Sequence, residues 1–117
     1  MNETTPSATP TVLVVGCGFP QLGLIRHCRD LGLRTVGVDM NPRAVGVAYC
    51  DGFEEVSTGD VTAVAGAARK HGADGVVTSG SEMALRTAAE VCHALGLRFY
   101  APPEVVDRCQ SKKLMRE

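Results

Sequence analysis

The sequence lacks an excess of charge of either sign, and it lacks any long apolar run. Its 12 lysines and arginines nearly balance 13 acidic residues, so the net charge of the 117-residue chain is -1. This balance argues against a nucleic-acid or anionic-membrane partner, which would need a basic patch. No apolar run reaches the roughly 18 residues of a membrane span, and the first residues lack the pattern of a signal peptide. We therefore expect a cytoplasmic protein with no nucleic-acid and no membrane partner.

Cysteine is present, but not in the patterns of a disulfide framework or a zinc site. The five cysteines are an odd number and include no C-x-x-C pair. Cys28 and Cys92 fall at apolar positions of helical patterns and are predicted to pack in the core. Cys17 lies in a glycine turn beside a helix start that could lower its thiol pKa, but no histidine is placed to act as its base. We expect no metal site and assign no catalytic residue.

Strand and helix patterns alternate along most of the chain. Residues 1–10 are rich in Thr, Ser and Pro and are predicted to be a disordered leader. Residues 11–109 are predicted to form one domain, a common domain size. Apolar or β-branched runs predict strands at 12–15, 34–38, 75–78 and 98–100, whereas helical spacing predicts helices at 20–31, 61–71, 82–95 and 104–109.

The ends of the predicted helices support this order of elements. Gly32, Gly72 and Gly96 each stand where a left-handed residue ends a helix, directly before the next strand. Apolar strands between helices are typical of a parallel sheet that is covered on both faces. The sequence therefore predicts an α/β fold with three layers, an open doubly wound and mainly parallel sheet of about five strands. Residues 110–117 resemble the opening of another helix without a stop signal, so we expect a fragment that continues into a missing domain.

The turn after the first strand resembles a phosphate-binding loop with one position changed. A dinucleotide fingerprint reads G-x-G-x-x-G, and here Gly16 and Gly18 are followed by Gln21 instead of the third glycine. Gly23 comes two residues late. Backbone N–H groups of residues 18–21 at a helix start could bind an anion, or the glycines could serve only a tight turn. The Gln21 amide could contact a polar substrate or be a solvated helix residue.

Other candidate site residues follow the remaining strands, where doubly wound sheets bind ligands. Asp39 stands where a dinucleotide domain places its ribose-binding acid, but Asp39 to Pro42 also reads as a turn. The segment from Thr78 to Glu82 offers hydroxyl groups, including that of Ser81, and one carboxylate. Glu82 could bind an amine, or it could belong to a capping box with Ser79 as the N-cap. We expect the segments 16–23, 39–43, 58–60 and 78–82 to form one rim.

Taken together, these segments resemble the N-terminal, pre-ATP-grasp domain of ATP-grasp ligases. The family includes formate-dependent glycinamide ribonucleotide transformylase, biotin carboxylase and carbamoyl phosphate synthase. The resemblance extends from Thr11 to the end of the chain. Its marks are the Gly16-x-Gly18-x-x-Gln21-Leu22-Gly23 turn, Val38-Asp39-Met40-Asn41-Pro42-Arg43-Ala44, Ala48-Tyr49-Cys50-Asp51, Thr78-Ser79-Gly80-Ser81-Glu82, Ala101-Pro102-Pro103 and Ser111-Lys112-Lys113-Leu114-Met115-Arg116.

The resemblance implies a fold, a reaction and a set of binding residues. Full-length members use ATP and magnesium to turn a carboxylate into an acyl phosphate, which an amine or related nucleophile then attacks. The first domain does not hold ATP but helps to bind the carboxylate or amine, so no cofactor is expected in this fragment. This chain departs from the family pattern at Gln21 and Ser111, where many relatives carry an acidic residue. The substrate-binding role is carried over to Gly18, Gln21, Leu22 and Glu82, and the rim adds Asp39 and Ser81.

Two other functions stay open at the level of sequence. Gly16, Gly18 and Asp39 are also compatible with an NAD(P)-binding domain of an oxidoreductase or sensor. The chain could instead be a non-catalytic interaction module whose partner covers the rim. The expected partners are a small carboxylate or amine, the missing ATP-grasp domain in cis, and a second copy in a homodimer.

Overall fold

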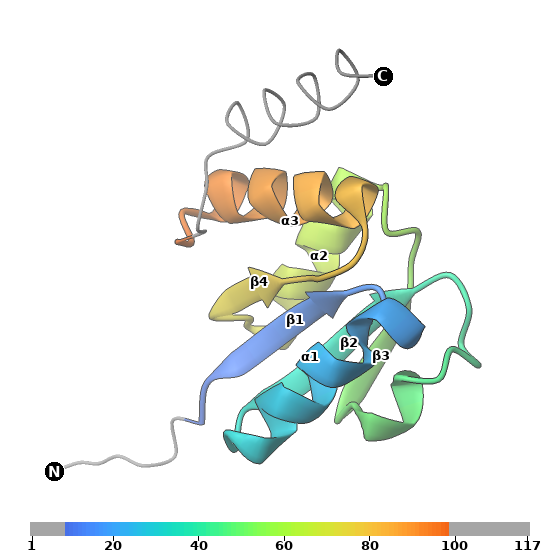
Figure 1. Ribbon diagram of the computed structural model, residues 1–117. Coiled ribbons are helices and arrows are strands. Elements are labelled where there is room, and N and C mark those ends of the chain that lie inside the picture. Colours follow the sequence, from blue (N-terminus) through green and yellow to red (C-terminus); the bar gives the residue numbers. More distant parts are fainter. Residues whose placement is uncertain (1–8, 99–117) are drawn as a thin grey trace, which may run out of the picture.

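A computed structural model describes residues 9–98 as a four-stranded parallel sheet between two layers of helix (Figure 1). The strand order is β3-β2-β1-β4, and each neighbouring pair is parallel. The strands are β1 (Thr11–Val15), β2 (Arg34–Asp39), β3 (Gly52–Glu55) and β4 (Gly75–Val77); the helices are α1 (Phe19–Asp30), α2 (Val61–His71), α3 (Glu82–Leu95) and the 3-10 turn η1 (Val47–Tyr49).

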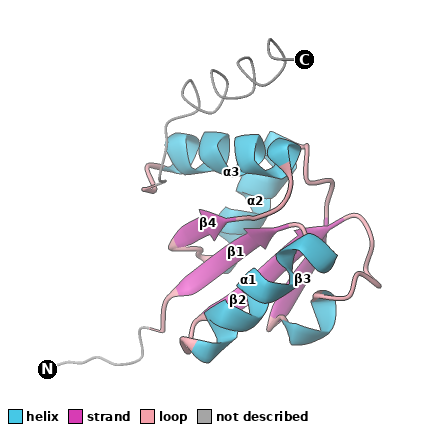
Figure 2. Cartoon of the chain, viewed as in Figure 1, coloured by secondary structure: helices cyan, strands magenta, loops and turns pink. Residues whose placement is uncertain are grey.

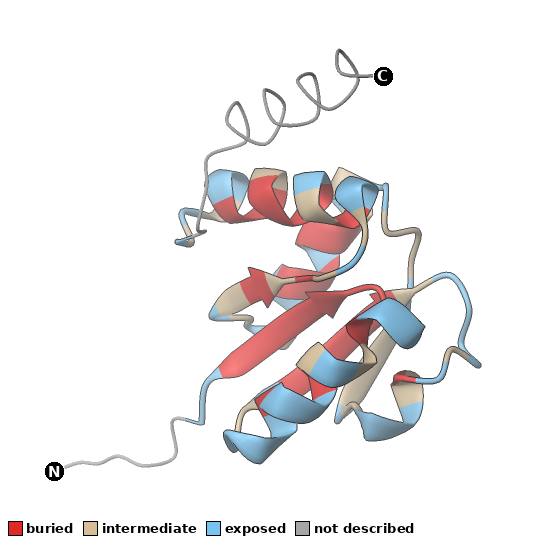
Figure 3. Cartoon of the chain, in the orientation of Figure 1, coloured by how far each residue is buried: buried red, intermediate tan, exposed pale blue. Residues whose placement is uncertain are grey.

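The two faces of the sheet are covered by different helices, as Figure 2 shows. Leu13 and Val15 of β1 pack into a cluster with buried residues of α2 and α3. Val14, which points to the other face, packs with Ile25 of α1. All five residues of β1 are buried (Figure 3), because the strand is central and covered on both sides. The predicted three-layer α/β fold is confirmed.

The chain reverses direction across the sheet after β3. It runs outward from β1 to β2 and β3, and then returns through α2 to place β4 on the other side of β1. The turns after β1 and β4 therefore lie next to each other while their helices cover opposite faces. Such a switch point is where open α/β sheets bind ligands.

Most predicted elements are found, two of them with the predicted bounds. These two are α2 and α3, and both end at a left-handed glycine, Gly72 and Gly96. Gly32 after α1 also has a positive φ of 79°. The sequence analysis did not predict β3, a partly exposed edge strand whose two glutamates interrupt any apolar run.

Several predictions fall outside the described residues. They are the leader apart from Thr9 and Pro10, the completion of a fifth strand at 98–100, the helix at 104–109 and the connection at 110–117. Within the described part of the chain, no helix has the length and apolar character needed to cross a membrane.

A cluster of charged side chains attaches the edge strand β3 to the end of α2. Glu54 Oε2 lies 2.7 Å from His71 Nε2 and 3.0 Å from Lys70 Nζ. The hydrogen bond from His71, followed by that from Lys70, lowers the pKa of Glu54 below its ordinary value of 4.5. The ionised carboxylate of Glu54 is therefore stabilised in the folded protein.

We expect Glu54→Gln to destabilise the protein near neutral pH and to have little effect in acid. A carboxyl group with a lowered folded-state pKa contributes stability above its unfolded pKa, and this contribution is lost as the pH falls through the folded value. Urea unfolding of both proteins at about pH 7 and about pH 3 measures the difference. Glu55→Gln, at the exposed neighbouring position, is the control. An equal loss for Glu55→Gln, or a difference that persists at low pH, would contradict the assignment.

Candidate functional site

Several backbone N–H groups of the turn between β1 and α1 donate hydrogen bonds to acceptors within the protein. Gly16 N donates to Val38 O at 2.8 Å, and Cys17 N donates to Asp39 Oδ2 at 2.8 Å. Gly18 N donates to Gln21 Oε1 at 2.9 Å, and Gln21 N donates to Gly18 O at 3.0 Å. Two donors of the predicted anion cradle, those of Gly18 and Gln21, thus have partners inside the turn. The glycines here serve a turn closed by its own hydrogen bonds.

The Gln21 side chain covers the two glycines. Only 5% of Gln21 is exposed, so the interpretation as a solvated helix residue is wrong. A Cβ atom added at Gly16 would lie 3.0 Å from both Cδ and Oε1 of Gln21. In a dinucleotide-binding turn, this absence of a side chain lets the pyrophosphate approach the backbone. Here the Gln21 amide occupies part of that space.

The same amide joins the turn after β1 to the turn after β4. Gln21 Nε2 donates to Ser79 O at 2.6 Å, and Ser79 Oγ donates to Pro20 O at 2.9 Å. Gly80 has a φ of +71°, and a Cβ atom there would lie 2.5 Å from Pro20 Cβ. The second turn can approach the first because residue 80 is glycine. Two segments almost sixty residues apart are therefore fixed against each other at the switch point.

The alternative interpretation of Ser79 and Glu82 as a capping box at the start of α3 is wrong. The N-cap is Ser81, whose Oγ accepts a hydrogen bond from Ala84 N at 3.2 Å, and Glu82 is the first helical residue. Ser79 cannot serve as the cap because the left-handed Gly80 delays the helix start and the Ser79 hydroxyl bonds to Pro20. Glu82 is exposed beside the rim.

Asp39 shapes the turn at the end of β2. Its Oδ2 accepts from Cys17 N, and its Oδ1 accepts from Asn41 N at 2.9 Å. Asn41 Oδ1 in turn accepts from Arg43 N at 3.0 Å. The turn predicted from Asp39 onward is present, and the Asp39 carboxylate also fixes the glycine turn of the neighbouring strand.

A hollow of about 230 Å³ lies beyond the carboxyl ends of the strands. All four segments predicted to form the rim contribute to it. Of the predicted binding residues, Gln21, Asp39 and Ser81 line it, whereas Gly18, Leu22 and Glu82 are not among its lining residues. The full lining is Gly16, Gln21, Asp39, Met40, Ser57, Thr58, Ser81, Met83 and Ala84.

Three lining residues, Ser57, Met83 and Ala84, lie outside the segments predicted for the rim. Ser57 follows β3, and it was missed because that strand was missed. Met83 is the second residue of α3, and its thioether points to Gly59, where an added Cβ would lie 2.9 Å from Met83 Sδ. No local signal in the sequence marks this approach, since Met83 lies in α3 and Gly59 lies in the loop before α2.

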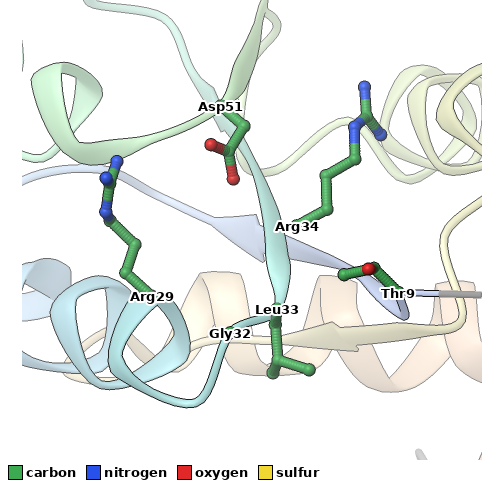
Figure 4. A pocket seen from close by; sticks show the side chains of 6 residues that line it. All are labelled: Thr9, Arg29, Gly32, Leu33, Arg34 and Asp51. Atoms are coloured by element: carbon green, nitrogen blue, oxygen red, sulfur yellow. The ribbon is translucent and has the colours of Figure 1, made fainter. Parts of the chain in front are cut away.

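A larger hollow of about 440 Å³ lies at the opposite, amino-terminal edge of the sheet (Figure 4). Two of its polar side chains have structural partners: Asp51 Oδ2 accepts from Thr35 N at 2.8 Å, and an Arg29 guanidinium nitrogen donates to Tyr49 O at 2.8 Å. Ligands of doubly wound sheets bind at the carboxyl edge. The smaller hollow is therefore the candidate site. In the described residues, no group of three or more His, Cys, Asp or Glu could hold a metal ion.

Fold and site together define a doubly wound α/β domain with a small polar hollow at its switch point. No protein-family model and no curated protein matches the sequence. Similar solved structures exist, with a TM-score of 0.70 and 23% identity for phosphoribosylglycinamide synthetase from Anaerococcus prevotii, over 76% of this chain and 23% of that one. The biotin carboxylase subunit of pyruvate carboxylase has a TM-score of 0.69 and 24% sequence identity, and the match covers 92% of this chain and 27% of that one. Glycinamide-RNase-transformylase T from Mycobacterium tuberculosis has a TM-score of 0.66 and 18% sequence identity, and the match covers 83% of this chain and 28% of that one.

These likenesses confirm, at the level of the fold, the resemblance drawn from the sequence. The enzymes found include biotin carboxylases and a transformylase, which the sequence motifs had indicated. The chain spans about a quarter of the length of these three proteins.

We expect Gln21→Ala to lower the free energy of unfolding by about 2–4 kcal/mol, because the substitution leaves Ser79 O and Gly18 N without their partner and opens a cavity. Gly23→Ala on the same helix is the matched control. Gly23 is exposed, and nothing lies within 4 Å of an added Cβ, so this variant should be stabilised by about 0.5–1 kcal/mol. Chemical denaturation of both variants tests the assignment, and a Gln21→Ala protein as stable as the parent would contradict it.

Proposed function

We propose that this chain is the substrate-binding and docking domain of an ATP-dependent carboxylate-amine ligase that acts through an acyl phosphate. The observation that carries the proposal is the polar hollow at the switch point of a fold shared with such enzymes. The chain alone is not catalytic in this proposal. The ATP-binding and reacting groups belong to the rest of the longer protein.

The closed glycine turn supports a ligase domain over a dinucleotide-binding domain. A pyrophosphate needs the turn's N–H groups and the open space above its glycines. Here Gln21 fills part of that space and accepts from Gly18 N, and Asp39 accepts from Cys17 N. The same geometry does not fit the phosphates of ATP, so we assign no step of the reaction to a nucleotide bound at this turn.

The chemistry of the hollow favours the amine over the carboxylate. Among the described residues, its lining contains the Asp39 carboxylate, three hydroxyl side chains (Ser57, Thr58 and Ser81), and no Lys, Arg or His. A carboxylate and hydroxyl oxygens can accept hydrogen bonds from an ammonium group, whereas a bound carboxylate would face Asp39 without a cationic partner. Glu82, exposed at the start of α3, adds negative charge beside the rim.

Large apolar side chains around the same edge support a docking role. Phe19 is 80% exposed beside the glycine turn, and Met40 and Met83, at the hollow, are 66% and 57% exposed. Exposed apolar groups that gather around a ligand site are typical of a surface that another domain covers. The proposed cover is the ATP-grasp domain in cis.

We expect the isolated chain to bind a small amine and not a nicotinamide dinucleotide. In a ¹H–¹⁵N NMR titration with glycinamide, amide shifts should concentrate at Asp39, Ser57, Thr58 and Ser81. Formate or bicarbonate should give smaller shifts at these residues. Calorimetry with NAD(H) and NADP(H) should give no heat of binding, and micromolar binding of either dinucleotide would overturn the proposal.

We expect Thr58→Val to weaken glycinamide binding about three- to tenfold, because the variant removes one hydroxyl group from the hollow at nearly constant volume. Thr62→Val is the control, since Thr62 lies on the exposed face of α2. Equal affinities of the two variants for glycinamide would mean that the ligand does not bind in this hollow.

We expect a longer chain that continues beyond Glu117 into the ATP-grasp domain to hydrolyse ATP only when both a cognate carboxylate and amine are present. The chain of 117 residues alone should show no activity that depends on a nucleotide. A coupled assay of ADP release with paired additions of acid and amine measures this. Hydrolysis that is independent of both substrates would contradict the ligase assignment.

A further inference from the structure

Two thiols from separate loops meet beneath the glycine turn. Cys17 lies in the turn after β1 and is fully buried, and Cys50 follows η1 and is half-buried. Both sulfur atoms lie over Gly37 in the middle of β2. A Cβ atom added at Gly37 would collide with Cys17 Sγ and would lie 2.9 Å from Cys50 Sγ. Because one small group would strike both sulfurs, the two thiols lie side by side.

The two thiols also interact with each other. The two side chains shift each other's pKa in opposite directions. Interaction with the Cys50 side chain, followed by burial, raises the pKa of Cys17. The helix start that could have lowered the pKa of Cys17 does not do so, because the thiol points into the core, where its Sγ lies 3.8 Å from Val38 O.

Cys50 is the more reactive member of the pair. Interaction with the Cys17 side chain lowers the pKa of Cys50, and the nearby Arg29 guanidinium acts in the same direction, against the opposing effects of burial and Asp51. Its side chain is also the more accessible one. A partly exposed thiol with a lowered pKa beside a second, buried thiol is the arrangement of a reacting and a resolving cysteine.

We propose that Cys17 and Cys50 form a reversible disulfide when the protein meets a hydroperoxide, with Cys50 reacting first. The Cys50 thiolate attacks one peroxide oxygen, the O–O bond breaks, and with hydrogen peroxide the other oxygen leaves as water after taking a proton. The Cys50 sulfur is thereby oxidised to a sulfenic acid. Cys17 sulfur then attacks that sulfur, the S–O bond breaks, and a second water leaves with the Cys17 proton. The two thiols lose two hydrogen atoms, and one peroxide is reduced to two waters.

The bond would form next to the candidate site. Cys17 lies between Gly16, which lines the hollow, and Gly18, which is the N-cap of α1. Its N–H holds the Asp39 carboxylate, and its carbonyl oxygen accepts from Gly46 N at 2.7 Å. Disulfide formation requires the sulfurs to approach to about 2.05 Å, and both cysteines lie in segments between the regular elements. Oxidation would thus act on the geometry of Asp39 and Gly16.

The sequence makes the experiment direct, because trypsin places each of the five cysteines in a different peptide. The reduced full chain is treated with hydrogen peroxide, alkylated, digested without reductant and analysed by mass spectrometry. We expect peptide 1–26 linked to peptide 44–69, lighter than their sum by two hydrogen atoms, with loss of the link after dithiothreitol. Cys92, buried on the opposite face of the sheet, should remain a thiol and is the internal control.

Two variants separate the roles of the thiols. Cys17→Ser should leave a Cys50 sulfenic acid that dimedone traps, and Cys50→Ser should abolish both the link and the dimedone product. Circular dichroism checks that each variant is folded. For a Cys17→Ser protein that fails to fold, the order of alkylation in the parent chain serves instead, with Cys50 modified at least tenfold faster than Cys17. A link through Cys28 or Cys109, or oxidation of Cys50 to sulfinic acid without any link, would overturn the proposal.

Discussion

The carboxyl edge of the sheet, where the candidate site lies, depends on one buried amide. Gln21 accepts from Gly18 N, donates to Ser79 O and lies over Gly16, so it completes one turn and holds a second against it. A buried amide with both ends satisfied is stabilising mainly because removing it leaves other polar groups without partners, each at a cost of about 1–3 kcal/mol. With glycine at position 21, the two turns would share fewer bonds and the space above the glycines would be open.

The way this amide closes the turn decides where a ligand can lie. The crevice directly between the turns after β1 and β4 is bridged by the Gln21 and Ser79 bonds. The remaining hollow therefore opens toward the loops after β2 and β3 and the first turn of α3. Those segments bring an acid, hydroxyl groups and two methionines, so the lining of the hollow combines polar and apolar side chains. A small polar substrate held under a covering domain fits this distribution better than an extended dinucleotide.

The sequence predicted the parts of this structure whose signals are local. The bounds of α2 follow from the Asp60 cap and Gly72, and the core strands follow from their apolar runs. The edge strand β3 was missed because its residues are only partly buried. The rim was predicted as a set of segments, but the partners within it were not. Ser79 lies 58 residues from Gln21, and no local pattern around either residue indicates that the two form a hydrogen bond. The sequence similarly allowed two interpretations of Asp39, as a ligand-binding acid or as a turn residue. Its hydrogen bond from Cys17 N joins the ends of two strands and could not be predicted from either segment alone.

The glycine turn is also constrained from its core side, which explains why β2 carries a glycine at its centre. Val36 and Val38 point to the α2 and α3 face, and Gly37 points to the α1 face, where a larger residue would strike both thiols. A valine there would extend the apolar run of β2 and favour the strand. The absence of a side chain instead leaves room for Cys17 and Cys50. The turn that shapes the carboxyl edge is therefore held by Gln21 and Asp39 on one side and by a thiol pair on the other. A change in either set of contacts must be transmitted through the same short segment, because Gly16, Cys17 and Gly18 are consecutive.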